Sequence, residues 1–503
     1  MSSDTPTMRL GRGSGATPGL NLFTDPWIPV IYLDGSHGEV GVRDALTDAA
    51  RICTVAAEDP TVDVALHRLL LAVAHRLAGE VAPQAWPALW ESGLPLEGLE
   101  EVGAGRWELL PADGSPGFAQ DPVERPEAAP VASLTMWAER GSAAGFFGRI
   151  PESLTPAEAA RWLLWCQSYD TAGIRAAHGK GRDAGVPVGP AAAAPYTRLI
   201  GQSLAQTLML NLAPGARGPA GTGWWERTEP VVGRRRGRTP DGMVDLLCWP
   251  SRRIRLLVDA DGLVRGVFVT GGDDLKAPAD PGHGADQSYQ DAYKRVLPRS
   301  LETTIPGLTA PTKRRTAAPV TPEAITWFSD RHHLLDQVRV ETTTMATDKY
   351  RSTIQDTHAR TWDLPAAALV PGTDAHARLV QVRNMLRLAD HAVRTAAAAT
   401  VPARSSHAPE QAEDLADRAR HQWSGDLTPE LAHLDSAAGV AQAREALVAV
   451  VDQHIGLASQ RLRGNPARLA AGTSSLAQAR QLRDQLARYG VDSQAEETAG
   501  IGR

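Results

Sequence analysis

The chain has 503 residues, more than one hydrophobic core usually serves, so we expect two or three domains. Hydrophobic residues make up 43% and charged residues 22%, as in soluble globular proteins, and no apolar run reaches the roughly 18 to 20 residues that cross a bilayer. The net charge of −6 argues against a free-standing protein that coats nucleic acid, although it leaves room for a local basic surface.

The first twenty residues form a polar N-terminal segment. They are rich in Gly, Ser and Thr and lack the apolar stretch of a secretory signal. We therefore expect a disordered tail over residues 1–20, a cytoplasmic protein and no membrane partner.

The folded part of the chain is expected to begin with two short strands and a helix. The run Trp27–Leu33 is typical of a strand, and the D-G pair at 34–35 leads into a second strand through Val40 and Val42. Apolar residues then recur at helical spacing over residues 62–77, which predicts a helix with one buried face.

The middle of the chain is predicted to contain two helices separated by a loop. Thr155–Tyr169 begins with a capping-box arrangement, in which Thr155 is the N-cap, Pro156 opens the first turn and Glu158 follows three residues on. Gly173–Pro195 is dense in Gly, Ala and Pro and is predicted as loop. The apolar segment Leu199–Leu212 is predicted as the second helix.

Strands are expected after these helices. Val244–Trp249 and Ile254–Val258 are both strand-like, and the D-G pair at 261–262 turns the chain into Leu263–Thr270. This arrangement predicts a hairpin, whereas residues 271–320 show little pattern.

The chain changes character after residue 365, where proline becomes rare and alanine abundant. Three apolar stripes at helical spacing run through residues 379–393, 447–462 and 476–486, and a shorter helix is expected at Glu410–Trp423. Amphipathic helices joined by short loops bury their stripes most simply as a bundle. We therefore predict an α+β protein, with a large mixed domain over residues 21–365, a four-helix bundle over 366–490 and a disordered tail over 491–503.

The sequence offers little that indicates catalysis. It has no G-x-S-x-G nucleophile elbow, no H-E-x-x-H motif and no phosphate-binding P-loop. The three cysteines, at positions 53, 166 and 248, form no C-x-x-C pair, and His332-His333 is the tightest histidine cluster. Asp273-Asp274 could hold a magnesium ion or be a pair of solvated turn acids. We expect no enzyme, no cofactor and no bound metal.

Basic segments are more informative. Val232–Arg238 (V-G-R-R-R-G-R), Ser251–Arg255 (S-R-R-I-R) and Lys313–Arg315 could bind phosphate groups, because arginine donates two parallel hydrogen bonds to a phosphate. The alternative for each segment is an exposed, solvated loop. Tryptophans interleave here at positions 224, 225 and 249, where a buried core position is favoured over a base-stacking one.

The run N-L-F-T-D-P-W-I-P-V at Asn21–Val30 is the most specific motif of the chain. It resembles the N-L-L-x-[DE]-x-W-I-P-V start of the CasA family, the large subunit of the type I-E CRISPR Cascade complex. Its apolar residues are expected to form a buried strand, which Pro26 and Pro29 would confine to a sheet edge. Further stretches resemble the family in the same order, although glycine replaces a proline in the first of them: Gly117–Gln120, Ala159–Ile174, Leu204–Leu212, Trp224–Arg227 and Asp245–Leu256.

The resemblance implies a non-catalytic subunit that recognises the protospacer-adjacent motif in duplex DNA from the minor-groove side. The implied partners are other Cascade subunits, the guide RNA (crRNA), double-stranded target DNA and a helicase-nuclease effector. Such a subunit also helps to open the duplex, while the sequence of the target is read by guide pairing. A purely architectural subunit without motif sensing is the alternative, and a hydrolase with an unrecognised site is a third, remote hypothesis.

The resemblance also implies which residues contact nucleic acid. The glycine loop corresponds to Asp170–Ala177, in which Gly173 permits close approach to the groove and Arg175 reaches a phosphate; the DNA-contacting residues of this loop are Ala172, Gly173, Ile174 and Arg175. The alternative for this segment is an ordinary helix C-terminal turn that ends in glycine.

Three further elements follow from the resemblance. The strand-separating wedge corresponds to Lys349, Tyr350 and Arg351, where relatives often carry a glutamine and Tyr350 could instead stack on an unpaired base. The minor-groove lysine corresponds to Lys276, with Lys294 as a competitor. Two more residues, Phe146 and Phe147, lie in a loop that resembles the one contacting the RNA handle, or else belong to the core.

Overall fold

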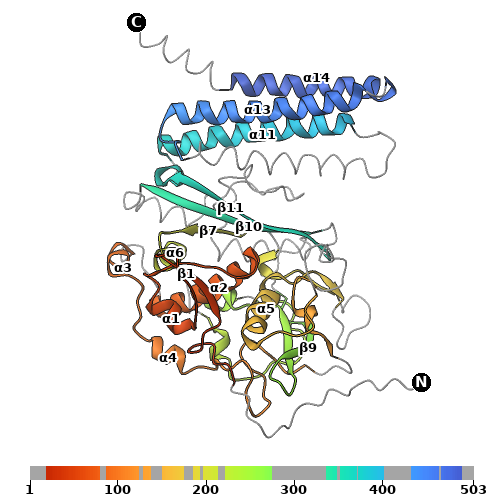
Figure 1. Ribbon diagram of the computed structural model, residues 1–503. Helices are drawn as coiled ribbons and strands as arrows, with labels where there is room; N and C mark the ends of the chain where they lie inside the picture. The colour runs from red at the N-terminus through yellow and green to blue at the C-terminus, as the bar shows by residue number, and fades with distance from the viewer. Residues whose placement is uncertain are drawn as a thin grey trace, which may run out of the picture. The chain divides into compact units, whose positions relative to one another are not determined.

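The computed structural model divides the chain into two compact units (Figure 1), one of residues 1–297 and 343–359 and one of residues 298–342 and 360–503. The structure describes residues 19–79, 86–123, 128–137, 150–174, 185–192, 196–212, 221–238, 240–274, 336–347, 352–370, 372–400, 432–463 and 466–489. In this part of the chain no helix is both long and apolar enough to cross a membrane.

The first unit opens with a three-stranded antiparallel sheet. Strand β1 (Ile28–Tyr32) lies between β2 (His37–Val40) and β3 (Ile52–Val55), and the predicted turn is present, with Gly35 at a φ of 82°. The strand is buried as predicted, but its predicted place at a sheet edge is wrong. Pairing with β3 begins only at Val30, so Pro29 lies before the part of β1 that pairs on both sides.

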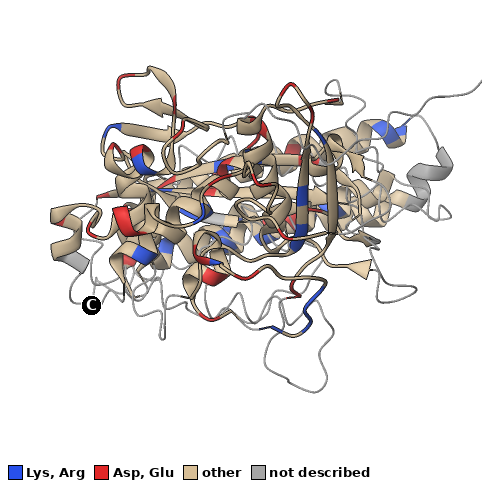
Figure 2. Cartoon of the chain, turned by 90° about the horizontal axis from the view of Figure 1, so that it is seen from below, with Lys and Arg blue, Asp and Glu red and all other residues tan. Residues whose placement is uncertain are grey.

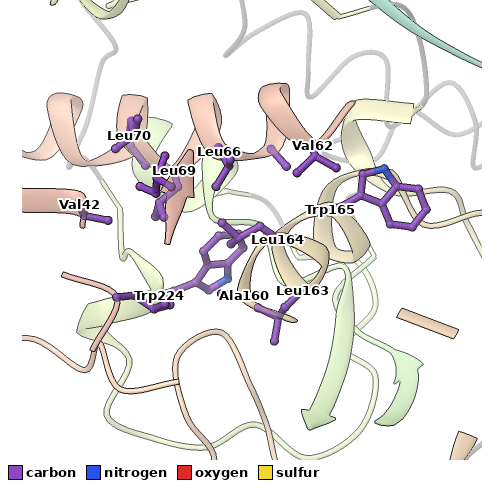
Figure 3. Close-up of a cluster of buried hydrophobic side chains, with 14 of the residues drawn as sticks. Val42, Val62, Leu66, Leu69, Leu70, Ala160, Leu163, Leu164, Trp165 and Trp224 are labelled. Atoms are coloured by element: carbon purple, nitrogen blue, oxygen red, sulfur yellow. The ribbon is translucent and has the colours of Figure 1, made fainter. Parts of the chain in front are cut away.

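Helices α2 and α5 form the centre of the first unit's apolar core (Figure 3). Helix α2 (Pro60–Ala78) begins where the Asp59 carboxylate accepts a hydrogen bond from the Thr61 amide at 2.8 Å. Helix α5 (Pro156–Tyr169) begins with the predicted capping box of Thr155 and Glu158. Both predicted helices are confirmed, but they are buried over most of their circumference, so the single buried face predicted for residues 62–77 is wrong.

A second antiparallel sheet carries the residues that matter below. Strands β8 (Arg252–Val258) and β9 (Val264–Gly271) form the predicted hairpin, and β9 also pairs with the short β4 (Ala129–Pro130). The strand predicted at Val244–Trp249 is wrong, because Met243–Leu247 is helix α7, which packs on α2. Short apolar runs do not distinguish a buried strand from a buried helix.

The helix predicted at Leu199–Leu212 is only partly confirmed. Its first residues belong to strand β7 (Tyr196–Ile200), and the helix, α6, covers Leu204–Asn211 after the N-cap Ser203. Strand β7 pairs in the order β11-β10-β7 with two long strands that the sequence did not predict, β10 (Gln337–Thr347) and β11 (Ile354–Pro365).

Short elements complete the first unit and lead into the second. The α-helices are α1 (Val42–Thr47), α3 (Trp86–Ser92) and α4 (Leu99–Gly103), the short strands are β5 (Gly173–Ile174) and β6 (Gly185–Val186), and the 3-10 helices cover Val131–Leu134, Pro190–Ala192, Trp224–Glu226 and Ala366–Leu369. Val42 therefore begins a helix rather than ending the second strand.

Three long helices of the second unit pack against one another: α11 (Asp374–Thr400), α13 (Ala437–Arg463) and α14 (Pro466–Arg488). The predicted stripes of α11 and α13 are buried, and that of α14 is buried except for the partly exposed Leu482. The mixed fold and the C-terminal helical region are thus confirmed. The fourth predicted helix, Glu410–Trp423, lies outside the described residues, and the domain boundary near residue 366 stays a prediction.

Candidate nucleic-acid interface

The segment that leaves α5 forms a two-stranded stem. Strands β5 and β6 pair antiparallel, with Gly173 opposite Val186 and Ile174 opposite Gly185. We call these two strands the stem. Residues 175–184, which join them in sequence, lie outside the described part of the chain, and so does the predicted phosphate contact Arg175.

Gly173 is in an extended backbone conformation, and the described residues leave open space around it. Its φ is not in the left-handed region, and a Cβ atom at this position would have no heavy atom of the described residues within 4 Å outside its chain neighbours. Helix α5 ends earlier, at Tyr169, and its C-cap Asp170 has a φ of −53° and a ψ of 141°. The alternative interpretation, a helix C-terminal turn that ends in a left-handed glycine, is therefore wrong. Neither backbone strain nor packing of the described residues requires glycine at position 173.

The two ends of the stem return to the same place, the C-terminal end of α5. The amide of Gly189 donates a hydrogen bond to the carbonyl oxygen of Asp170 at 2.8 Å. A side chain at Gly189 would collide with the backbone of Ser168 and Tyr169, so only glycine permits this close approach. The stem is thus anchored to a buried helix at its base.

Arg252, the first residue of β8, fills the space at this anchor. Its side chain is fully buried, and its Nε donates to the Asp170 carboxylate at 2.6 Å. Its Nη2 lies 2.7 Å from the carbonyl oxygen of Pro187, after β6, and 3.1 Å from that of Thr171, before β5. The Gln167 side chain, in turn, pairs with both backbone groups of Arg252 at 3.0 Å. One guanidinium group therefore connects both ends of the stem to α5.

A second arginine contacts the other strand of the stem. Arg234 donates to the carbonyl oxygen of Gly185 at 2.6 Å and forms a bidentate pair with Asp274, at 2.9 and 2.7 Å. Because Asp274 lies three residues after the end of β9, this pair connects the first residue of β6 to the end of the second sheet.

The carboxylate of Asp273 is the centre of a larger charge network. Its side chain is fully buried and accepts hydrogen bonds from Arg235 at 2.6 and 3.0 Å and from Arg238 at 2.6 Å, and a short one from Arg253. Burial alone raises the pKa of this carboxyl, but the Arg235 hydrogen bonds and the charges of Arg253 and Arg238 outweigh it, so the pKa lies below its ordinary value. Asp273 is therefore neither a solvated turn acid nor placed to hold a magnesium ion.

The arginine-rich segments have a structural role that the sequence did not indicate. Arg252 and Arg253 are 0% and 1% exposed, so their predicted role as phosphate ligands is wrong. Arg238 lies 4.0 Å over the Trp249 ring and also binds Asp245 at 2.5 and 3.0 Å. The three tryptophans of this region are buried, which confirms that they are core residues: Trp224, Trp225 and Trp249. In Figure 2, Lys and Arg are interspersed with Asp and Glu over the described part of the chain.

The remaining predicted contacts lie outside the described residues. These are Lys276 and its competitor Lys294, the wedge residues Lys349, Tyr350 and Arg351, the phenylalanines Phe146 and Phe147, the pair His332-His333 and the basic segment Lys313–Arg315. The wedge residues fall between β10 and β11, which are neighbours in one sheet. Among the residues that are described, no group of three or more His, Cys, Asp or Glu side chains could hold a metal ion.

The buried role of Arg252 and Arg253 was not predicted, although the sequence contains a weak indication of it. Arg252 and Arg253 begin a strand, and neighbouring strand residues point to opposite faces. Two consecutive arginines at the start of an otherwise largely apolar strand therefore suggest that at least one of them is buried, and a buried arginine needs carboxylate partners. Asp170 and Asp273, which supply them, are distant in sequence.

Comparison with known proteins identifies what the chain is similar to. The family model of CRISPR-associated protein Cse1 matches residues 21–488. The CRISPR-associated protein CasA/Cse1 of Thermus thermophilus is 31% identical over 263 residues, which are 50% of this chain. The aligned part spans about half of that relative's length, 51%.

Solved structures share the fold over almost the whole chain. The Cse1 crystal structure from Acidimicrobium ferrooxidans has a TM-score of 0.69 at 22% identity and covers 94% of this chain and 99% of that one. A chain of a CRISPR RNA-guided surveillance complex in a pre-nicking state has a TM-score of 0.62 at 16% identity, with 93% and 98% covered. At these identities the likeness shows a shared fold.

Proposed function

Because the chain belongs to the family of CRISPR-associated protein Cse1, also called CasA, we propose that it is the large, non-catalytic subunit of an RNA-guided surveillance complex. In this role it recognises the protospacer-adjacent motif in duplex DNA with the segment around Gly173. Its partners are the other subunits of the complex, the guide RNA, the target duplex and a helicase-nuclease effector.

The observation that carries the proposal is Gly173 itself. The described residues pack nothing against it, its backbone is extended, and it lies on a stem that is anchored at its base to buried residues. A glycine that its own fold does not require is what a surface needs for close approach by another backbone or a base edge. The minor groove presents a degenerate pattern of donors and acceptors, so a short backbone segment is sufficient to test it.

The finer assignments remain part of the proposal. Strand opening is assigned to Lys349, Tyr350 and Arg351, and the minor-groove contact to Lys276. The RNA-handle contact is assigned to Phe146 and Phe147. In sequence, the wedge residues lie between β10 and β11, two long strands that are neighbours in one sheet, and this position supports the assignment.

A binding titration tests the proposal against the architectural alternative. Complexes assembled with and without this subunit would be titrated with duplex targets that carry the correct or an altered flanking motif, at several salt concentrations. A sensing subunit predicts tighter binding of the correct motif only when the subunit is present, because phosphate contacts alone do not discriminate sequence. Equal affinities for both motifs in the intact complex would leave only the architectural role.

A further inference from the structure

We propose that Arg252 and Arg234 are positioning residues that hold the stem in a fixed geometry before DNA binds, and that this preorganisation sets how well the flanking motif is recognised. The inference rests on the proposed function of Gly173. It assigns a role to the fully buried Arg252 and the partly buried Arg234 that does not require either of them to touch nucleic acid.

Arg252 is suited to this role by the geometry of its contacts. Its guanidinium group reaches the Asp170 carboxylate, the carbonyl oxygens of Thr171 and Pro187, and its neighbour's carbonyl oxygen, that of Ser251, at 2.9 Å. These acceptors lie on both sides of the stem and at the end of α5. A planar fork with five N–H donors can satisfy them together, whereas a lysine ammonium is a single point with three donors.

The electrostatic setting favours the same arrangement. The carbonyl groups at the C-terminal end of α5 carry partial negative charge, which stabilises a cation placed there. Arg252 is 0% exposed and Asp170 is 3% exposed, so solvent does not replace either partner when the pair is broken. A buried charge without its partner is strongly unfavourable, and the stem is therefore held firmly against α5.

Arg234 secures the second strand from another direction. Its hydrogen bond to the Gly185 carbonyl oxygen acts at the first residue of β6, opposite Ile174 in the stem. Gly271, at the end of β9, also lies close to this strand, since a Cβ atom there would be 2.7 Å from Cγ1 of Val186. Together the two arginines connect β6 with the second sheet and with α5.

The functional consequence is a lower entropic cost of recognition. A segment that must be ordered when it meets DNA loses affinity, because fixing each backbone residue costs conformational entropy. A stem that is already fixed carries Gly173 in one position and avoids that cost. Loosening the stem should therefore weaken binding of the correct motif more than binding that depends on phosphate contacts alone.

The experiment compares Arg252→Lys and Arg234→Gln with the control Arg255→Lys in the assembled complex. Arg255 lies on the same strand as Arg252, but it donates to the Gly114 carbonyl oxygen and not to the stem. Hydrogen exchange of the amides of Gly173, Ile174, Gly185 and Val186 reports on the stem, and exchange in β1–β3 serves as an internal reference. Affinities for duplexes with the correct and the altered motif are measured in parallel.

We expect both stem variants to raise hydrogen exchange in the stem about tenfold or more relative to β1–β3. Both should also lower the affinity for the correct motif about tenfold, while the affinity for the altered motif changes little. In the control variant, neither the exchange in the stem nor the affinities should change much. Arg234→Gln keeps the test valid if Arg252→Lys does not fold. Unchanged exchange in the stem would overturn the inference. Faster exchange with unchanged discrimination between the two motifs would also overturn it. In that case, if Gly173→Asp still weakened target binding, the proposed function would stand. If Gly173→Asp did not weaken it, the proposed function and this inference would both be wrong.

Discussion

Helix α2 and the stem belong to the same unit but are held in place by different interactions. Along α2, apolar side chains such as Leu66 and Leu69 are fully buried and pack toward α5 (Figure 3). Around the stem, Val186 and Val188 are buried beside charged groups, of which Arg252 and Asp170 are buried and satisfy one another. Apolar packing is non-directional and tolerates changes of similar volume, whereas a paired buried charge depends on each partner and on its geometry.

The difference explains why one part of the molecule carries the site. A stem built from two residues in each strand has too little apolar surface to be fixed by packing. Hydrogen bonds from Arg252 and Arg234 fix its position without covering Gly173. Apolar packing holds α5 in place, and the stem is attached to α5. The charged hydrogen bonds then fix the position of the stem relative to α5.

The largest effect is expected from Asp273→Asn. The substitution removes the anion that Arg235, Arg238 and Arg253 share, and it leaves the buried Arg253 with only the more distant carboxylate of Asp121, at 3.3 Å. The free energy of unfolding should fall by about 3–5 kcal/mol. Urea unfolding of the purified chain, followed by tryptophan fluorescence, measures the change.

Asp44→Asn is the matched control for that prediction. Asp44 pairs with Arg43 at 3.1 Å, and both side chains are about 40% exposed, at 41% and 42%. Solvent screens such a pair, so the substitution should cost no more than about 1 kcal/mol. If both variants lost the same small amount, the network around Asp273 would contribute no more than a surface ion pair, and the contrast with the apolar core would be lost.

The pH dependence of stability sharpens the comparison from the apolar side. His75 in α2 is buried, its Nε2 has no partner among the described residues, and burial lowers its pKa to about 4. Between its ordinary pKa of about 6.5 and 4, the unfolded chain binds a proton that the folded chain does not. The free energy of unfolding should therefore decrease as the pH is lowered from 6.5 to 4, by at most about 3 kcal/mol.

His75→Leu isolates this contribution, because leucine fills a similar volume and does not titrate. The variant should show a flatter loss of stability between pH 6.5 and 4, measured by urea unfolding at a series of pH values. His67 is also buried, and burial and the nearby charge of Arg198 lower its pKa. It contributes to the pH dependence with the same sign and remains in the variant. Asp273 acts in a separate window: because its pKa is depressed, its contribution is lost only as the pH falls below about 3.9. An identical pH profile for His75→Leu and the original chain would contradict this account.

The sequence predicted the apolar elements well and the charged ones poorly. Helical spacing at Leu379 and Val382, or the capping box at Thr155, is a local pattern, and local patterns determine such elements. Apart from its neighbour Ser251, the partners of Arg252 lie 65 to 85 residues away in the chain, so no local pattern reveals them. Strand β10 was not predicted, although its burial alternates from Val338 to Val340. The reason is that threonines occupy the following positions, where a strand pattern was expected to show apolar residues. Of the predicted DNA contacts, the structure describes only Ala172, Gly173 and the backbone of Ile174.

The most direct test of the account is Gly173→Asp in the assembled complex. The substitution adds a charge and a side chain where the described residues leave open space, so stability should change by no more than about 0.5 kcal/mol. Gly456→Asp is the matched control, since Gly456 is exposed in α13 and also has open space around it. We predict that Gly173→Asp lowers the affinity for duplex targets with the correct motif at least about tenfold while Gly456→Asp does not. Normal target binding by a stably folded Gly173→Asp complex would contradict the account.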